Sequence, residues 1–287
     1  MFYNKRMSKQ IHWYPGHMKK AQNEIEAKLK IVDCIIELLD ARIPVSSRNN
    51  SIYRMTEGKA RLVVLTKNDL ADPKETRKWI SHFEENGIHA IFADLNKKAD
   101  ILTIIKEAEK LGEKKHEKEI ARGMKPQPIR AMIVGIPNVG KSTLINKMAN
   151  RKAASVQNKP GHTKSQQWIK VSNQFELLDT PGILPSYYKD EKDAINLALV
   201  GSVKVDILPI EELAGIGFNY MKENYFANLL ARYPYIDEKY DSNSVFNLIA
   251  EKRGYLSKGK EDIEKAQKVF LNELKNGVLG QITLERI

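Results

Sequence analysis

The chain has little cysteine and no long hydrophobic run, and each scarcity excludes a class of protein. One cysteine, Cys34, among 287 residues excludes a disulfide framework and a metal cluster held by several cysteines. No apolar run approaches the ~18 residues that a membrane span needs. Residues 1–10 are polar and basic, unlike a secretory signal. We therefore expect a cytoplasmic protein with no membrane partner, in which Cys34 is a buried strand thiol.

Acidic residues are missing from a long central stretch of the chain. From Ile120 to Phe175 there is no Asp or Glu, while ten basic residues occur: Arg122, Lys125, Arg130, Lys141, Lys147, Arg151, Lys152, Lys159, Lys164 and Lys170. This acid-free stretch carries nearly all of the net charge of +11. It is either a solvated basic face or a surface for nucleic acid. The composition favours the second, with structured RNA as the partner and no DNA expected.

Short apolar runs alternate with amphipathic segments, a rhythm typical of an α/β fold. Strands are predicted at residues 32–39, 61–65, 90–93, 129–135, 168–171 and 175–178, and helices at 73–85, 100–118 and 141–149. Residues 122–128 are a linker, because two prolines and a glycine cannot continue a helix. Beyond about Gly201 strand signals largely end, and helices are predicted at 211–232, 244–253 and 261–275. The sequence thus predicts a mostly parallel sheet with helices on both faces over residues 1–202, and a small all-helical domain over 203–287.

Residues 135–142 fit G-x-x-x-x-G-K-[ST], the P-loop that cradles nucleotide phosphates between a strand and a helix. Backbone N–H groups and the helix N-terminus are expected to hold the phosphates. The ammonium of Lys141 is expected at the β- and γ-phosphates, and the hydroxyl of Ser142 is expected to ligate Mg²⁺. The predicted phosphate-binding residues are Asn138, Val139, Gly140, Lys141, Ser142 and Thr143.

Two further elements complete a phosphate site. Asp179-Thr180-Pro181-Gly182 fits D-x-x-G, in which Asp179 holds Mg²⁺ through a water and the N–H of Gly182 senses a γ-phosphate. Thr163 is the candidate switch I residue that ligates Mg²⁺ and touches the γ-phosphate. An ordinary surface loop at Thr163 stays an open alternative.

A guanine reader of the form [NT]-K-x-D stands at Thr66-Lys67-Asn68-Asp69, directly after a predicted strand. The carboxylate of Asp69 can accept from guanine N1–H and the 2-amino group, and the stem of Lys67 can lie along the base. The hydroxyl of Thr66 can tie this loop to the P-loop backbone. In the next turn, Ala93-Asp94-Leu95-Asn96 is expected to cover the base edge with backbone N–H groups facing O6, and Ala93 and Asp94 are the predicted contact residues. The reader normally follows the other elements; here it precedes them, which predicts a circularly permuted P-loop GTPase.

The segments Trp13–Met18, Asp40–Pro44 and Ser46–Asn49, with the permuted order, resemble the ribosome biogenesis GTPase A family, also called RbgA or YlqF-like. The resemblance implies a GTP-hydrolysing factor that binds GTP and GDP. It also implies binding to the large (50S) ribosomal subunit and its rRNA late in assembly, with turnover stimulated by that particle. The helical tail then resembles an RNA-binding module.

The resemblance also bears on catalysis. Ile183 and Leu184 follow Gly182, where a glutamine usually orients water, and in relatives the histidine matching His17 is the proposed substitute. A purely structural role for His17 stays open. Asn138 matches a position of potassium-dependent relatives, so K⁺ is expected near the phosphates. Two alternatives are a GTP-gated RNA-binding protein with negligible turnover, and a P-loop ATPase or kinase, which Asp69 disfavours.

Overall fold

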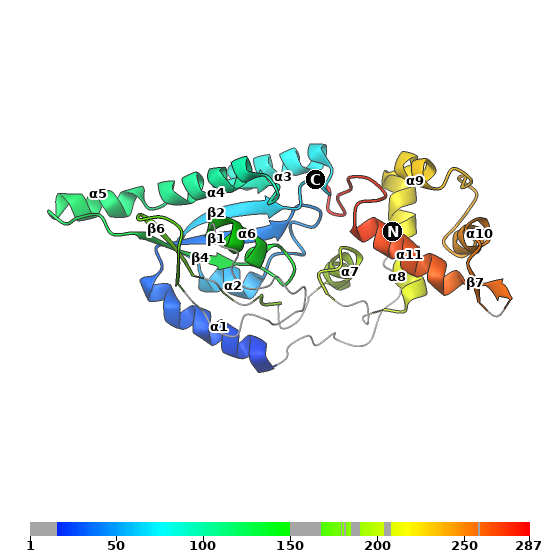
Figure 1. Ribbon diagram of the computed structural model, residues 1–287, viewed down its shortest axis with the longest axis horizontal. Helices are drawn as coiled ribbons and strands as arrows, with labels where there is room; N and C mark the ends of the chain where they lie inside the picture. The colour runs from blue at the N-terminus through cyan, green and yellow to red at the C-terminus, as the bar shows by residue number, and fades with distance from the viewer. Residues whose placement is uncertain are drawn as a thin grey trace. The chain divides into compact units, whose positions relative to one another are not determined.

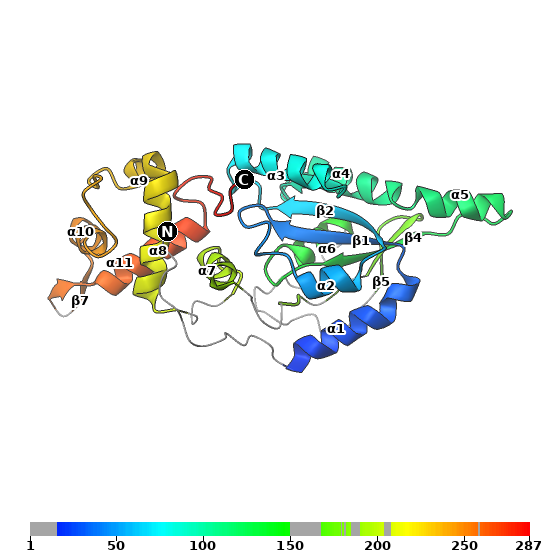
Figure 2. The same cartoon turned by 180° about the vertical axis from the view of Figure 1, so that it is seen from behind.

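The chain divides at residues 187 and 188 into two compact units, here called the sheet unit and the helical unit. The computed structural model describes residues 16–149, 168–178, 180, 182–184, 190–203, 208–257 and 259–287; of residues 16–19 and 21 it describes the backbone only. Figures 1 and 2 show the sheet unit with its strands and the helical unit around α8 and α11 from two sides.

The sheet unit is built on six strands in the order β3-β2-β1-β4-β6-β5. Their bounds are β1 Cys34–Asp40, β2 Ala60–Thr66, β3 Ala90–Ala93, β4 Ile129–Val134, β5 Trp168–Lys170 and β6 Phe175–Leu178. All pairs are parallel except β5 with β6. Each predicted strand is present to within about two residues, because buried parallel strands are continuous apolar runs. The predicted fold class is confirmed.

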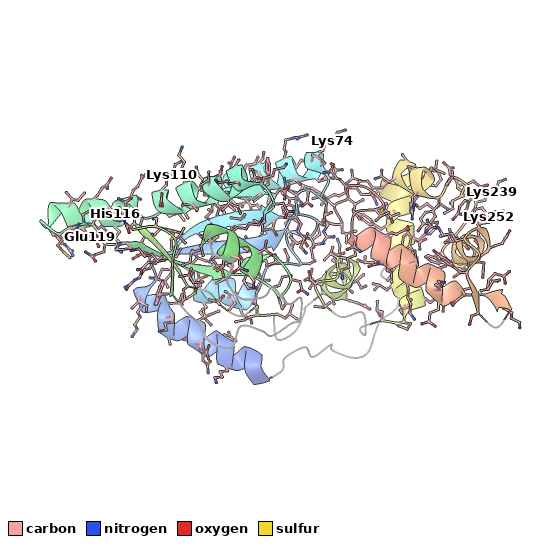
Figure 3. The ribbon with its side chains drawn as sticks, in the orientation of Figure 1. Lys74, Lys110, His116, Glu119, Lys239 and Lys252 are labelled. Carbon is pink, nitrogen blue, oxygen red and sulfur yellow. The ribbon has the colours of Figure 1, made fainter. Side chains whose placement is uncertain are left out.

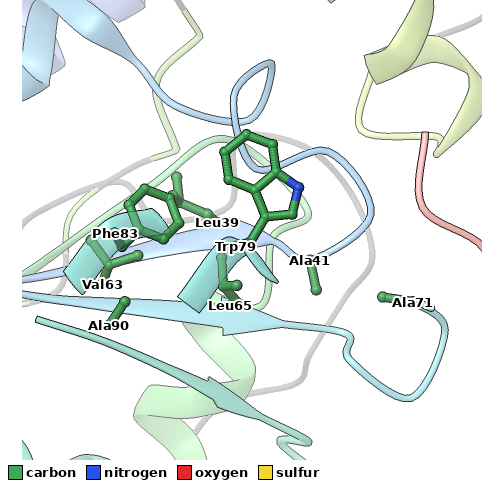
Figure 4. Close-up of a cluster of buried hydrophobic side chains, with 8 residues drawn as sticks. All are labelled: Leu39, Ala41, Val63, Leu65, Ala71, Trp79, Phe83 and Ala90. Carbon is green, nitrogen blue, oxygen red and sulfur yellow. The ribbon is translucent and has the colours of Figure 1, made fainter. Parts of the chain in front are cut away.

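Both faces of the sheet are covered, so its central strands are buried on either side. Helix α3 (Pro73–Glu85) places Trp79 and Phe83 over Leu39, Val63 and Leu65 (Figure 4). Residues at the alternate positions of β2 point to the opposite face and are fully buried as well. Helix α4 (Lys98–Lys110) contacts β2, β3 and α6 (Lys141–Met148).

The prediction of a single helix over residues 100–118 is wrong, because two helices, α4 and α5 (Glu113–Ala121), cover this range. The break comes at Gly112, where a Cβ atom would lie 2.0 Å from Cδ1 of Ile129. The close approach of this buried side chain leaves room only for glycine. The structure contains two helices that the sequence did not predict, α1 (Gly16–Lys28) and α2 (Asn50–Met55). Both lie on one side of the sheet, next to each other (Figure 1).

The helical unit contains α7 Glu191–Leu199, α8 Ile210–Asn224, α9 Phe226–Arg232, α10 Val245–Lys252, the strands β7 Leu256–Ser257 and β8 Lys260–Glu261, and α11 Ile263–Lys275. Phe218, Phe246 and Phe270 form its core, with ring centroids 5.5–6.4 Å apart and near edge-to-face. The predicted helix over 211–232 is interrupted at Tyr225, whose backbone is not helical and whose hydroxyl accepts from the N–H of Thr283 at 3.1 Å.

The division between the units comes earlier than the predicted boundary at residues 202 and 203. Helix α7 belongs to the helical unit because it packs on α8 and α11. A Cβ atom at Gly217 of α8 would lie 3.1 Å from Cδ2 of Leu199, so glycine lets the two helices approach closely. Among the described helices, none is long and apolar enough to cross a membrane.

Candidate nucleotide site

The P-loop connects the end of β4 to the start of α6, as the sequence predicts. It is tight. A Cβ atom at Gly135 would lie 2.8 Å from the carbonyl oxygen of Leu38, and one at Gly140 would lie 2.8 Å from Cδ1 of Leu95. Gly140 and Asn138 both have positive φ, at 111° and 60°. Glycine and asparagine tolerate this backbone region best, which explains these residue types at these positions.

Lys141 lies across its own loop. Its Nζ donates to the carbonyl oxygens of Gly135, at 3.0 Å, and Ile136, at 2.8 Å, and the residue is 7% exposed. The ammonium is thus held where phosphate oxygens would meet it. Ser142, in the first turn of α6, is exposed, and Thr143 is half-buried. The loop and the helix N-terminus together form an anion-binding arrangement.

The guanine reader is joined to the P-loop by a hydrogen bond. Thr66 ends β2 and is fully buried; its Oγ1 donates to the carbonyl oxygen of Val139 at 2.7 Å and lies 3.1 Å from that of Leu39. The prediction that this hydroxyl ties the reader to the P-loop backbone is confirmed. Segments 73 residues apart in sequence therefore meet at one edge of the sheet.

Lys67 is held by a buried carboxylate. It has a positive φ of 57°, and its Nζ is 3.0 Å from Oδ2 of Asp40. Asp40 also accepts from Nε of Arg42 at 3.0 Å and from Nη2 at 2.8 Å. Burial disfavours the charged form of Asp40, but the two cations and their hydrogen bonds hold its pKa well below its ordinary value. Lys67 is therefore fixed at the mouth of the reader.

Asp69 is exposed at the same edge of the sheet. Asn68 is half-buried, and its Oδ1 has no hydrogen-bond partner among the described residues. In the turn expected to cover the base edge, the backbone N–H groups of Asp94 and Asn96 are occupied within the protein. The N–H of Asp94 donates to Asp100 at 2.8 Å and that of Asn96 donates to Asp94 at 2.9 Å. Ala93 is the buried last residue of β3.

Gly182 lies against the P-loop. A Cβ atom there would lie 2.9 Å from both Nζ of Lys141 and Cα of Pro137. The hydroxyl of Thr180 donates to the carbonyl oxygen of Ile133 at 2.5 Å, which fixes the turn to β4. The predicted γ-phosphate sensor therefore sits beside the lysine that would bind the same phosphate. Three predicted residues are not placed: Thr163 and Asp179 lie outside the described residues, and so does the side chain of His17.

The structure adds a segment to the site to which the sequence assigned no role. Asp40–Asn49 follows β1 at the same edge, and both of its ends reach the site, at Lys67 and at the carbonyl of Ile183. Its position directly after a buried parallel strand is a signal that was available, because ligands bind at the carboxyl ends of such strands.

Comparison with known proteins agrees with this geometry. Residues 130–222 match the family described as 50S ribosome-binding GTPase. The chain is 40% identical over 277 residues to Ribosome biogenesis GTPase A of Bacillus pumilus, covering 96% of this chain and 98% of that protein. It is 33% identical over 278 residues to the Thermotoga maritima protein of the same name, covering 96% of this chain and 94% of that one. The chain belongs to the ribosome biogenesis GTPase A family.

Solved structures of this family have the same fold. A GDP-bound YlqF structure from T. maritima aligns with a TM-score of 0.66 at 28% identity, covering 92% of this chain and 98% of that one. A GNP-bound YlqF structure from the same organism aligns with a TM-score of 0.62 at 29% identity, covering 93% and 98%. The predicted resemblance to the ribosome biogenesis GTPase A family is confirmed. The prediction of an enzyme that hydrolyses GTP to GDP and phosphate is confirmed with it.

Proposed function

We propose that the chain binds the large ribosomal subunit through rRNA and hydrolyses GTP there late in subunit assembly. The particle stimulates turnover, K⁺ assists it, and the action takes place in the cytoplasm. One observation carries the nucleotide part of the proposal: the 2.7 Å hydrogen bond from Thr66 to the carbonyl of Val139, which brings base reader and P-loop together. The names of the relatives and the basic surface support the ribosomal part.

Guanine specificity rests on Asp69. Its carboxylate accepts from N1–H and the 2-amino group, donors that adenine does not present in that arrangement. Asp69→Asn is expected to weaken GTP binding and to admit xanthine nucleotides, whose 2-oxo group suits an amide. Competition of GTP, ATP and xanthosine triphosphate against a fluorescent guanine nucleotide measures this. Equal affinity of wild-type protein for ATP and GTP would contradict the assignment.

The phosphate side fits Mg²⁺. Gly135, Gly140 and Gly182 let the backbone pack closely around the P-loop, and Ser142 is exposed next to Lys141 at the start of α6. Ser142, with Thr163 and with Asp179 through a water, would hold the ion, which neutralises phosphate charge. The exposed side chain of Asn138 would face K⁺. Lys141 neutralises β- and γ-phosphate charge, while the N–H of Gly182 contacts the γ-phosphate.

Water cannot be oriented by the residues after Gly182. Ile183 and Leu184 are apolar and 3% and 6% exposed, so neither presents a polar group to an attacking water. His17 is the proposed catalytic substitute. We expect His17→Ala to bind GTP and the particle normally and to lose most of the stimulated rate. A variant that keeps full stimulation would leave His17 with a structural role.

RNA is the proposed partner of the acid-free stretch. Its described basic residues outside the P-loop are all exposed: Arg122, Lys125, Arg130, Lys147 and Lys170. The helical unit also presents exposed lysines, among them Lys239 and Lys252 (Figure 3). Positive side chains on a soluble surface attract the phosphates of structured RNA.

The decisive experiment compares GTP hydrolysis with and without 50S particles, in K⁺ and in Na⁺ buffer. The proposal predicts slow turnover alone, a clear increase with particles, and a larger rate in K⁺. The buried apolar Ile183 favours one competing function, a GTP-gated RNA-binding protein with negligible turnover. GTP-dependent particle binding without any rise in hydrolysis would establish that alternative instead.

A further inference from the structure

The segment Asp40–Asn49 is a rigid connection rather than a loose loop. The N–H of Asp40 donates to Oγ of Ser47 at 3.0 Å, and the N–H of Ser47 donates to the carbonyl of Ile43 at 2.9 Å. Asp40, Arg42 and Ser47 are each at most 2% exposed. Buried polar groups that are mutually hydrogen-bonded specify one conformation. Both ends of the segment are therefore held in place relative to β1.

One end of this segment is anchored at the base reader. Asp40 lies between Arg42 and Lys67, with Nζ of Lys67 3.0 Å from its Oδ2. Asp40 and Arg42 are buried and the side chain of Lys67 is 24% exposed, so solvent screens this anchor only in part. The other end of the segment is therefore held at a fixed position relative to the base-binding side of the site.

The other end is Asn49, whose side chain makes two kinds of contact. Its Oδ1 accepts from the N–H groups of Ser51, at 3.0 Å, and Ile52, at 3.3 Å, and so caps helix α2. Its Nδ2 donates to the carbonyl oxygen of Ile183 at 3.0 Å, across 134 residues of sequence. Capping needs only the oxygen. The amide nitrogen instead donates its hydrogen bond to the turn that contains Gly182.

We propose that Asn49 is a positioning residue for γ-phosphate recognition: by holding the carbonyl of Ile183, it keeps the N–H of Gly182 in place beside Lys141. Gly182 is the residue immediately before Ile183, and a Cβ atom on it would lie 2.9 Å from Nζ of Lys141. The side chain of Ile183 is buried, so the carbonyl and the side chain together fix the turn. This inference rests on the proposed guanine-nucleotide site.

The proposal distinguishes GTP from GDP. GDP lacks the γ-phosphate, so its binding depends on the base reader and the P-loop and does not need Gly182. A loosened Gly182 turn therefore weakens GTP while leaving GDP unchanged. General destabilisation of the sheet unit weakens both nucleotides alike, so the ratio of the two affinities separates positioning from a merely structural role.

Two substitutions remove the contact to Ile183 and keep the helix cap. Asp and Ser are both good N-cap residues, so Asn49→Asp and Asn49→Ser keep an oxygen for the N–H groups of α2. Neither presents the amide donor. Asn49→Asp adds a negative charge and Asn49→Ser adds none. If both variants change nucleotide affinity in the same way, the change does not come from the added charge. Asn49→Ala removes both the cap and the link.

The measurement is the dissociation constant of GDP and of a non-hydrolysable GTP analogue, by fluorescence at fixed Mg²⁺. For Asn49→Asp and Asn49→Ser we expect the analogue to bind about fivefold more weakly, the effect of one hydrogen bond, with GDP unchanged within about twofold. Asn49→Ala is expected to show the same nucleotide pattern together with a lower melting temperature. The matched control is Asp262→Ala, which removes the cap of α11 in the helical unit and leaves both affinities unchanged.

Equal weakening of GDP and the analogue, or no weakening of either, overturns the role of Asn49. Wild-type protein serves as the test of the underlying site. If it binds neither guanine nucleotide, the proposed function fails and the inference falls with it. If it binds both and the variants match it, only the inference fails.

Discussion

The ammonium of Lys141 contacts two carbonyl oxygens of its own loop, so it is positioned before any phosphate arrives. Preorganisation of this kind lowers the cost of ordering the side chain when the ligand binds. Lys147, on the same helix, is exposed. The two lysines carry the same charge in the same helix. Only Lys141 is held at the P-loop, so only Lys141 is expected to bind phosphate.

We expect Lys141→Ala to reduce GTP affinity by at least about tenfold, because it removes a charge-assisted contact to the phosphates. Equilibrium binding of a fluorescent GTP analogue measures the loss. Lys147→Ala is the matched control and is expected to bind like wild type. If both variants lost affinity equally, the effect would come from the net charge and not from the P-loop.

Cys34 is fully buried at the start of β1, as predicted for a strand thiol. Burial, with a smaller contribution from Asp33, raises the pKa of its thiol from 9.0 to about 12. The unfolded chain loses this proton near its ordinary pKa, while the folded chain keeps it. The neutral thiol therefore contributes stability below about pH 9, and that contribution is lost as pH rises from about 9 toward 12.

We expect the free energy of unfolding to fall as pH rises above about 9, and to fall less in Cys34→Ala than in wild type. Urea unfolding at pH 7, 9 and 10 measures both curves. In native protein at pH 8 the thiol is expected to react with a disulfide reagent only as fast as the sheet unit opens. Rapid labelling at pH 8 without unfolding would show that Cys34 is accessible.

At the scale of elements, the site depends on where strands end. β1, β2, β4 and β6 are parallel neighbours, so the segments that follow them emerge at the same edge. The P-loop after β4 and the reader after β2 are then close enough for the hydrogen bond between Thr66 and Val139. The rotated order of motifs along the chain does not alter this, because the sheet brings the same strand ends together.

Thr66→Val is expected to lower the free energy of unfolding by about 1–3 kcal/mol, since it leaves the carbonyl of Val139 without its donor. It is also expected to weaken guanine nucleotides, because the reader loses its connection to the P-loop. Urea unfolding and nucleotide titration measure the two effects. Thr66→Ser keeps the hydroxyl and should restore most of both. A Ser variant no better than Val would assign the loss to packing of the methyl group.

At the scale of the whole molecule, the positive charge is unevenly distributed along the chain. The acid-free stretch from Ile120 to Phe175 carries basic residues that are exposed wherever they are described outside the P-loop. Lysines outside this stretch are often paired within the protein, as Lys110 is with Glu107 at 2.7 Å. Within the stretch Arg130 is paired with Glu176 at 3.3 Å, whereas no ion pair is found for Arg122 and Lys125 among the described residues. Surface charge without such a partner is more available to a polyanion.

We expect binding to large-subunit rRNA to weaken steeply with salt, each phosphate contact contributing roughly 0.7–0.9 to the slope of log K against log salt. Reversing two charges, Arg122→Glu and Lys125→Glu, should reduce that slope by about one to two. Filter binding over a salt series measures it. Reversing two exposed charges of α3 outside the stretch, Lys74→Glu and Arg77→Glu, makes the same charge change, and an equal reduction there would show that only net charge matters.

Sequence alone determined the features that depend on neighbouring residues. The P-loop residues, the guanine reader and the strand bounds follow from short spacings and apolar runs, which act within one element. The linker at residues 122–128 and the burial of Cys34 follow from the same local rules. So does helix α3, whose predicted bounds match because Asp72 caps it and Pro73 begins it.

Tertiary structure decided what depends on contacts between distant segments. The break at Gly112 comes from Ile129, and the occupied N–H of Asp94 comes from Asp100. The sequence assigned Asn49 no structural role; the structure shows that it caps α2 and that it also contacts Ile183, 134 residues away. No local pattern encodes such a pair, because the folded sheet alone brings the two strand ends to the same edge.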